Sequence, residues 1–504
     1  MKVKTFSAAV YIWLLLGLAA CSGTETGTSE KRPGHSTPEE EGIPSRSILE
    51  FVEALEKAQP DAIHSFILRR NGNIVAEGWW RPYAPESPHM LYSLSKSFTS
   101  TAIGMAQDEG LLSVNDPVIS FFPEEVPDEP GENLKAMRIR DLLRMNTGHQ
   151  EGTLGRMRGS DNWVEAFLAL EVPYKPGTHF LYNTGATYMC SAIIQKVTGM
   201  TLLEYLTPRL FEPLGIENPT WETDPRGINT GGYGLSITTE DISRFGQLLL
   251  QKGNWEGKQL VSEEWVEEAT SYQTSNGSDP ESDWEQGYGY QFWRCRYGIY
   301  RGDGAFGQFC IVMPLQNAVL AITSGSSDLQ GILNVVWEHL LPAMGDDPLA
   351  ADEEGLELLN DKLQGLAIKF PEGESGSPAA SEITGRTYEI AAENPFGHSI
   401  AFDFTASPAV ITIAINGGEV SFAAGSGSWE KGAMANPMTV SDKIAVSGAW
   451  EDPATYFVRM VYYETPFFMD FRFTFEGDRL IWDTGRNVSS GPGRADQFIG
   501  VAGS

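Results

Sequence analysis

The sequence predicts an α+β fold, in which an antiparallel sheet carries a helical lobe, followed by a C-terminal all-β domain. Three observations support this prediction. Strand-like segments stand at both ends of residues 41–345 and enclose a mostly helical middle, which favours pairing of an early hairpin with late strands. After residue 382, helical patterns give way to short alternating strands. The length of 504 residues also exceeds what one compact core usually holds.

Residues 1–21 have the pattern of a bacterial lipoprotein signal. Lys2 and Lys4 give a charged start, and the apolar run from Ala8 to Ala20 is too short for a comfortable membrane span. The last residues, "LAAC", resemble a lipobox, in which Cys21 would be lipidated and become the mature N-terminus. We therefore expect a protein tethered by lipid to a bacterial membrane, outside the cytoplasm. An ordinary secretion signal that ends near a cysteine is the alternative.

The composition of the next segment and the overall charge limit the function further. Residues 22–40 are rich in Thr, Ser, Gly, Glu and Pro, which predicts a flexible stalk. A net charge of −31 repels phosphate backbones and therefore argues against a nucleic-acid partner. The Cys and His spacings indicate no metal site, and we expect no cofactor. Cys295 and Cys310 flank a turn-like segment, so they either bond across a hairpin or stay two buried thiols.

Periodicity and turn residues predict the elements of the 41–345 domain. An amphipathic pattern begins at Ser47, and a hairpin follows through Asn71-Gly72. A helix from Ser95 ends at Gly110, whose type suits a left-handed C′ position. The remaining predictions are a helix at 239–253, strands at 287–298, 307–314 and 318–325, and a closing helix at 329–344. A helical pattern and a linker then fill 346–382.

The C-terminal region, 383–504, reads as an antiparallel β domain. Six or more segments alternate apolar and polar residues between Gly, Pro, Asn or Asp. In one of them Met469, Phe471, Phe473 and Phe475 share a face. The pattern predicts a small barrel or sandwich and contains no catalytic constellation.

Ser93 and Lys96 are the first catalytic candidates. At a helix start, residues three apart lie on one face within mutual reach. A lysine acts as a base only if burial or nearby cations lower its usual pKa of about 10.4. The helix N-terminus would favour an attacking alkoxide and a developing oxyanion. The chain also contains Ser428 and Lys431 at the same spacing, but in a Gly-rich loop between strands, and we interpret that copy as chance.

Several segments in order resemble the penicillin-recognising serine hydrolases, the superfamily of class C β-lactamases, D-Ala-D-Ala carboxypeptidases and 6-aminohexanoate-oligomer hydrolases. The similar segments are 92–118, 137–149, 176–199 and 231–250, within a region from about 41 to 343. The resemblance implies the β-lactamase/transpeptidase-like fold. It also implies that Ser93 is the acylated nucleophile, Lys96 its base or relay, and Tyr182 the partner that passes protons to the leaving group and to water. The sequence leaves open which of Lys96 and Tyr182 is the base.

Two motifs depart from the family pattern. The family has Tyr-x-Asn, whereas here Thr184 is third and Asn183, expected to bind substrate, stands one place early. In the third motif Gly304 fits the glycine that lets substrate approach the strand, and Gln308 follows as a further substrate-binding candidate. The backbone N–H of Ala305 would join that of Ser93 as an oxyanion hole. A plain hairpin turn is the alternative for this segment.

The resulting hypothesis is a serine hydrolase that forms an acyl-enzyme on Ser93 and cleaves an ester, an amide or a D-amino-acid peptide bond. Its partner would be a small-molecule or short-peptide substrate. The third motif lacks the cation that normally meets a β-lactam carboxylate, which argues against a true β-lactamase. The alternatives are that enzyme, or a non-catalytic binder of a cell-wall ligand on the same fold. The sequence does not determine the oligomeric state or the role of the C-terminal domain.

Overall fold

The computed structural model describes residues 34–390, 394–435, 441–489 and 496–503. Residues 34–504 belong to one compact unit. Cys21 lies outside the described residues. Residues 34–40 fall in the predicted stalk, yet they lie against the sheet, since Ser36 N–H donates to the Ile74 carbonyl. No helix in the described ranges is long and apolar enough to cross a bilayer.

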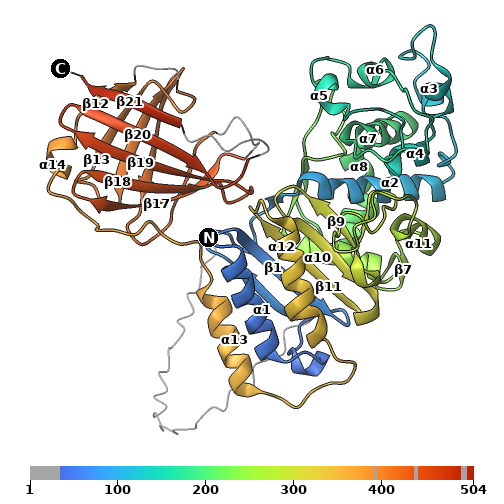
Figure 1. The fold of residues 1–504 in the computed structure, drawn as a ribbon, viewed down its shortest axis with the longest axis horizontal. Coiled ribbons are helices and arrows are strands. Elements are labelled where there is room, and N and C mark those ends of the chain that lie inside the picture. The colour runs from blue at the N-terminus through green and yellow to red at the C-terminus, as the bar shows by residue number, and fades with distance from the viewer. Residues whose placement is uncertain (1–33, 391–393, 436–440, 490–495, 504) are drawn as a thin grey trace, which may run out of the picture. The chain divides into compact units, whose positions relative to one another are not determined.

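A six-stranded antiparallel sheet forms the centre of the first region, in the order β2-β1-β11-β10-β9-β8 (Figure 1). The early hairpin pairs with a late strand, as predicted, with Phe66 opposite Ile322. The strands are β1 (Ile63–Arg70), β2 (Asn73–Trp79), β8 (Trp293–Arg294), β9 (Tyr300–Gly304), β10 (Gln308–Met313) and β11 (Ala318–Ser324).

Both faces of this sheet are covered, so strands β1, β9, β10 and β11 are buried along their whole length. Helices α1 (Ser45–Ala58), α12 (Leu329–Val335) and α13 (Glu353–Gly365) pack on one face (Figure 1). Helix α10 (Thr239–Leu250) packs on the other, where Phe245 joins the same core as Ala321. Burial on two sides accounts for continuous apolar runs in place of alternation.

The helical lobe is inserted between β2 and β8. Its central helices are α2 (Ser95–Asp108) and α7 (Thr184–Thr198), which pack against each other in its core. The other helices are α3 (Glu132–Ala136), α4 (Ile139–Leu143), α5 (Leu154–Met157), α6 (Trp163–Leu168), α8 (Leu202–Leu206), α9 (Glu212–Leu214) and α11 (Glu263–Thr270). Short strands accompany them: β3 (His89–Met90), β4 (Thr220–Trp221), β5 (Leu235–Ile237), β6 (Asn254–Trp255) and β7 (Lys258–Gln259).

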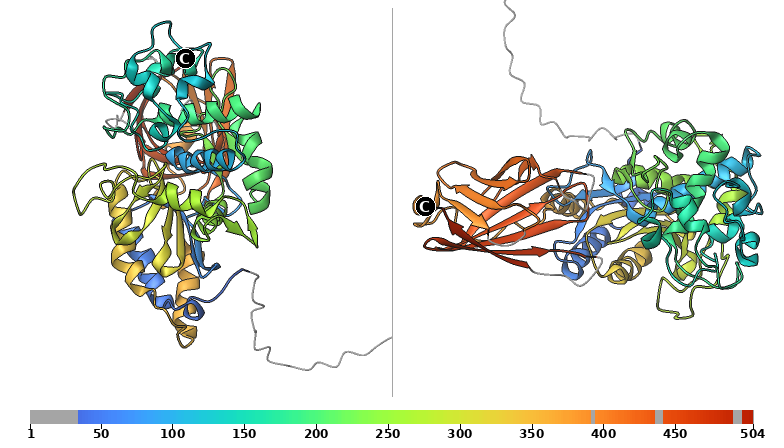
Figure 2. Two further views of the ribbon diagram at one scale, coloured as in Figure 1. Left: turned by 90° about the vertical axis from the view of Figure 1, so that its right-hand side faces the viewer. Right: turned by 90° about the horizontal axis from the view of Figure 1, so that it is seen from above.

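The C-terminal domain is one ten-stranded antiparallel sheet that curls into a nearly closed barrel (Figure 2). Its core contains Met469, Phe471, Phe473 and Phe475, as the alternation predicts. The strands are β12 (Thr387–Ile390), β13 (Ser399–Asp403), β14 (Ala409–Ile415), β15 (Gly418–Ala424), β16 (Glu430–Ala433), β17 (Lys443–Asp452), β18 (Thr455–Val461), β19 (Phe468–Glu476), β20 (Arg479–Arg486) and β21 (Asp496–Ala502), and the short helix α14 (Ala380–Ile383) precedes them.

The structure corrects one predicted strand. Within the predicted 287–298 strand, only Trp293–Arg294 forms a strand, β8. Gln291 and Tyr297 have φ values of 68° and 61°, and this left-handed backbone interrupts an extended chain. The strand that pairs with β10 is β9, and the hairpin turn lies at residues 305–307.

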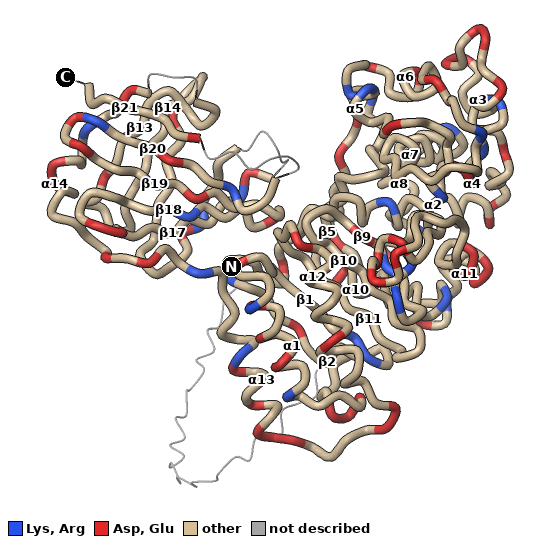
Figure 3. The backbone as a smooth tube through the Cα atoms, viewed as in Figure 1, with Lys and Arg blue, Asp and Glu red and all other residues tan. Residues whose placement is uncertain are grey.

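The two hairpin cysteines are free and buried, so the structure supports two separate thiols. The residue opposite Cys310 on β9 is Gly302, not Cys295. Acidic residues are distributed along the chain in both regions (Figure 3).

Candidate active site

Ser93 lies in a 3₁₀ turn, Tyr92–Leu94, that leads directly into α2. The turn places Ser93 half-buried at the N-terminal end of a helix whose first residues are buried. The Ser95 hydroxyl points away and donates to the Tyr92 carbonyl. Of Ser93 and Ser95, Ser93 is therefore the one whose hydroxyl faces Lys96.

Lys96 is almost fully buried, with 1% of its surface exposed. Its Nζ donates to Ser93 Oγ at 2.9 Å, to the Gly232 carbonyl at 2.7 Å and to Thr184 Oγ1 at 3.2 Å. Burial lowers the pKa of Lys96 to about 7, against the opposing effect of Asp303. Near neutral pH a large fraction of Lys96 is therefore uncharged and has a free lone pair.

Tyr182 completes the group around Ser93. Its ring centroid lies 4.9 Å from Lys96 Nζ, and its ring stacks on Trp293 at 5.3 Å. Burial raises the pKa of Tyr182 well above its usual value, although a hydrogen bond with Ser93 partly offsets this. The phenol thus stays protonated at neutral pH. The structure therefore brings the three predicted residues Ser93, Lys96 and Tyr182 together.

Asn183 and Thr184 make different contacts, although the family pattern has a single asparagine in this motif. The side-chain oxygen of Asn183 caps α7 and accepts from Gly185 N–H and from the backbone and hydroxyl of Thr153. Asn183 is fully buried and its oxygen is used within the protein. Its substrate-binding role stays a prediction. The Thr184 hydroxyl instead lies beside Lys96, in the place that the Tyr-x-Asn pattern assigns to asparagine.

The third motif runs along the nucleophile segment. A Cβ added at Gly304 would lie 2.1 Å from the Leu91 carbonyl oxygen, and one at Gly302 would lie 2.3 Å from Leu94 Cδ1. Only glycine permits this approach, which brings Ala305 close to the Ser93 turn. Gln308 is fully buried, and its amide donates to the Ala305 and Ser324 carbonyls. Its side chain therefore holds the turn at Ala305, and its predicted contact with substrate stays untested.

The cation near this motif faces inward. Arg301 is fully buried and pairs with Asp303 at 2.8 Å, and its guanidinium also donates to the Asp283 carbonyl and to Cys295 Sγ. The ring of Trp284 lies 4.4 Å from it. Arg301 is thus occupied within the protein and does not present its charge to a substrate.

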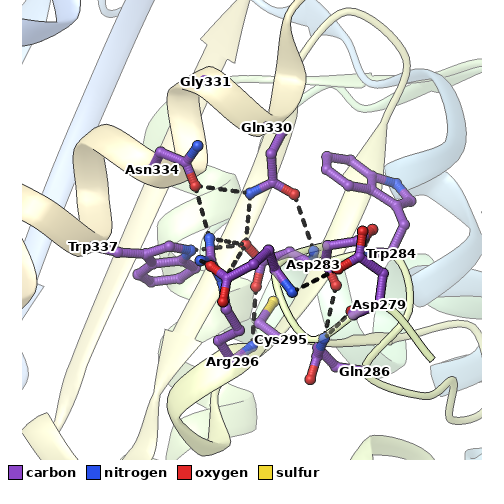
Figure 4. Close-up of polar contacts among 12 residues, drawn as sticks. Asp279, Asp283, Trp284, Gln286, Cys295, Arg296, Gln330, Gly331, Asn334 and Trp337 are labelled. Carbon is purple, nitrogen blue, oxygen red and sulfur yellow. Dashed lines mark hydrogen bonds and ion pairs between the residues drawn. The ribbon is translucent and has the colours of Figure 1, made fainter.

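A polar network surrounds the buried Asp283, whose backbone carbonyl accepts from Arg301. Figure 4 shows the side chains around the Asp283 carboxylate. The Asp283 carboxylate accepts from the side chains of Arg296, Gln330 and Trp337. Burial disfavours its charge, but these hydrogen bonds outweigh burial and lower the pKa of Asp283. The network therefore holds the loop at Asp283, whose backbone carbonyl accepts a hydrogen bond from Arg301.

Sequence reasoning assigned no role in the site to four residues that the structure places there: Thr184, Gly232, Asp303 and the inward Arg301. In the sequence, Thr184 is marked only by its departure from the Tyr-x-Asn pattern. The described residues contain no cluster of three or more His, Cys, Asp or Glu arranged to hold a metal ion.

The sheet, the helical lobe and the Ser-x-x-Lys pair at a buried helix start define a protein of the β-lactamase fold. Residues 52–331 match the family model described as Beta-lactamase. This match covers more than half of the chain, so the protein belongs to the Beta-lactamase family and to the serine-hydrolase superfamily built on that fold.

Individual relatives agree with this placement. The 6-aminohexanoate-dimer hydrolase of Paenarthrobacter ureafaciens is 26% identical over 306 residues, which cover 55% of this chain and 76% of that protein. Protein flp of Staphylococcus aureus is 25% identical over 169 residues, 32% of this chain and 34% of that protein. A Bacillus anthracis structure, proposed to be a 6-aminohexanoate-dimer hydrolase, superposes with a TM-score of 0.51 at 21% identity, over 61% of this chain and 86% of that one, which shows a shared fold.

Proposed function

We propose that this protein cleaves an ester or amide bond through an acyl-enzyme formed on Ser93. The observation that supports this most strongly is the half-buried hydrogen bond of 2.9 Å between Lys96 Nζ and Ser93 Oγ. A lysine with a pKa of about 7 can take a proton from a serine near neutral pH, which an ordinary lysine cannot.

The opposite pKa shifts of the two partners suggest how they divide the work. Lys96 is the group that can accept a proton at neutral pH, and Tyr182 is the group that holds one. When Lys96 is neutral, its two hydrogens can stay on Gly232 and Thr184 while its lone pair faces Ser93. We therefore assign the base to Lys96 and the proton relay to Tyr182.

The reaction would follow two acyl-transfer steps. Lys96 takes the Ser93 hydroxyl proton as Oγ bonds to the substrate carbonyl carbon. The backbone N–H groups of Ser93 and Ala305 would stabilise the oxyanion. When this oxyanion intermediate collapses, the bond to the leaving group breaks. The leaving group receives the proton from Lys96 through Tyr182. A water molecule then attacks the carbonyl carbon of the ester on Ser93 and gives a proton to Lys96. The bond to Ser93 Oγ breaks, Oγ takes that proton back from Lys96, and the acid is released.

We expect linear esters, amides or peptides with D-residues as substrates in preference to β-lactams. The name of one relative, a 6-aminohexanoate-dimer hydrolase, supports an amide of an ω-amino acid as a candidate substrate. Arg301, the cation nearest the third motif, is fully buried and paired with Asp303, so it leaves a β-lactam carboxylate without that partner. We expect turnover of a chromogenic ester and none of a cephalosporin.

A substrate panel tests the proposal. The purified chain and Ser93→Ala would be assayed with a chromogenic ester, a cephalosporin, a D-Ala-D-Ala peptide and a short ω-amino-acid amide. Intact mass would be measured after a serine-directed fluorophosphonate. We expect ester turnover and one adduct on Ser93. No turnover and no adduct would contradict catalysis and favour a binding protein, and an active Ser93→Ala would contradict the site.

We also propose that lipid on Cys21 tethers the protein to a membrane outside the cytoplasm. The sequence pattern alone supports this, since Cys21 lies outside the described residues. Cys21→Ser should move the protein from the membrane fraction to the soluble fraction of the host cell. An unchanged distribution would contradict the tether.

A further inference from the structure

The backbone beside Ser93 and beside Ala305 is strained at two aromatic residues. Tyr92, which precedes Ser93, has a φ of 49°, and Phe306, which follows Ala305, has a φ of 67°. Such left-handed conformations are unfavourable for bulky residues and persist only when the surroundings hold them. Because the peptide plane after Tyr92 contains the Ser93 N–H, the conformation of Tyr92 sets the direction of that donor.

The two aromatic side chains pack on each other and on a residue of the barrel. The ring of Tyr92 meets that of Phe306 edge to face at 5.4 Å. Phe467, just before β19, contacts both, with centroids 5.5 Å from Phe306 and 6.4 Å from Tyr92. Phe467 is 4% exposed and Phe306 8%, while Tyr92 is partly buried. These three residues form the aromatic triad, in which the two phenylalanine rings are nearly dry.

The turn that carries Phe467 is anchored on both sides of the contact. Within the barrel, the Thr465 hydroxyl accepts from Phe467 N–H at 3.1 Å. Towards the catalytic region, Tyr83 Oη donates to the Thr465 carbonyl, and Met90 N–H donates to the Glu464 carbonyl at 2.9 Å. The Phe467 ring is therefore presented at a set position, and it does not hang from a loose loop.

The approach of this turn to the central sheet leaves no room for a side chain. A Cβ added at Gly325, directly after β11, would lie 2.2 Å from the Pro466 carbonyl oxygen and 2.6 Å from Asn487 Nδ2. Asn487 donates to the carbonyls of both Gly325 and Pro466. The barrel turn is thus fitted closely against the strand end next to the site.

We propose that Phe467 is a positioning residue, through which the C-terminal barrel holds Tyr92 and Phe306 and so keeps the Ser93 and Ala305 backbone N–H groups aimed at the reacting carbonyl oxygen. This inference rests on the proposed acyl-transfer function. Without the Phe467 ring, Tyr92 and Phe306 have a cavity into which their strained backbones can relax, and the oxyanion loses aligned donors.

The decisive variants are Phe467→Ala and its control Phe498→Ala. Phe498 is also a barrel phenylalanine, 7% exposed, but it packs on Trp482 in the barrel core. We expect Phe467→Ala to lower kcat for the chromogenic ester by about 10-fold or more with little change in KM. Phe498→Ala should lose similar thermal stability and keep the wild-type kcat. Phe467→Tyr, which keeps the ring, should retain most of the wild-type kcat.

A second measurement separates positioning from contact with substrate. A methyl fluorophosphonate is small enough to react with Ser93 without contacting the barrel. It labels Ser93 through an oxyanion-like transition state. We expect Phe467→Ala to slow this labelling by the same factor as kcat. Gly325→Ala, which pushes the turn away without touching the triad, should slow it too, whereas Gly365→Ala, whose Cβ would meet nothing within 4 Å, should not.

Each result has a definite reading. A wild-type kcat in Phe467→Ala, or a change in KM alone, would overturn the positioning role. If Phe467→Ala does not fold, Phe467→Leu is measured in the same way with the same expectation. Labelling of wild type and Phe467→Ala at one rate contradicts only this inference, whereas a wild type that is never labelled contradicts the proposed function itself.

Discussion

The chain contains the pattern Ser-x-x-Lys in two places, and the two copies have very different surroundings. Ser93 and Lys96 lie at a helix start, hydrogen-bonded at 2.9 Å, with the lysine 1% exposed. Ser428 is exposed and donates to Glu430, while the exposed Lys431 holds its Nζ 4.8 Å from the ring of Tyr463. The same spacing yields a catalytic candidate in one copy and ordinary surface contacts in the other.

Local geometry and burial account for this difference. In a helical turn, residues three apart project to the same side. At Ser428 the chain enters β16, where successive side chains alternate, so a residue three positions on faces the other way. Water also keeps an exposed ammonium charged, whereas burial at Lys96 disfavours the charge.

The largest expected effect is on the nucleophile itself. Ser93→Ala should lower kcat/KM for the ester by at least about 10³-fold, because no other hydroxyl replaces the attacking oxygen. Ser428→Ala should leave kcat/KM unchanged within error. Steady-state kinetics of the two purified variants, with circular dichroism to confirm folding, would check the comparison. A loss of activity in Ser428→Ala would show that the second copy is not a chance match.

The two lysines should differ almost as much. Lys96→Met keeps an apolar stem in the pocket but removes the proton acceptor, and we expect a loss of about 10²- to 10⁴-fold in kcat. Lys431→Met removes only an exposed charge. Both variants would be assayed at pH 8. Equal activity of Lys96→Met and wild type would assign the base to another residue.

Glycines next to the two copies give a smaller contrast. In Gly304→Ala the new Cβ would lie 2.1 Å from the Leu91 carbonyl oxygen, so β9 must move away from the Ser93 turn. We expect a stability loss of about 1–3 kcal/mol, together with reduced kcat. In Gly432→Ala, beside Lys431, the nearest atom would be Ile444 Cγ1 at 3.6 Å, an ordinary contact. Urea unfolding and ester kinetics would compare them, and equal behaviour would contradict the close approach.

The smallest expected effect is a shift in pH dependence. Since Lys96 must lose its proton to act as base, kcat/KM should rise with pH through about 7, the pKa of buried Lys96. Asp303 raises that pKa, so Asp303→Asn should move the rising limb to lower pH. The pH profile would be recorded below the melting temperature of the variant, because Arg301 loses its partner. A limb that stays in place, or moves to higher pH, would contradict the influence of Asp303.

Much of the fold was accessible from the sequence because it rests on local signals. The hairpin at Asn71-Gly72, the helix from Ser95 and the alternating β19 each follow from turn residues or periodicity within a few positions. The prediction of a strand at 287–298 was wrong because Gln291 and Tyr297 adopt a left-handed backbone conformation. Glutamine and tyrosine are not residue types that predict this conformation. Ser93 and Lys96 could be paired because one helical turn joins them.

The sequence by itself determined the spacing of Ser93 and Lys96, the order of the elements and the alternation that builds the barrel, since these depend on neighbours along the chain. Only the tertiary structure decided which copy of the pattern is buried, that Thr184 and Gly232 surround the lysine, that Arg301 turns inward, and that Phe467 reaches the turn before Ser93. The physical reason is desolvation and packing: both depend on groups tens to hundreds of residues apart, which only the folded chain brings into contact.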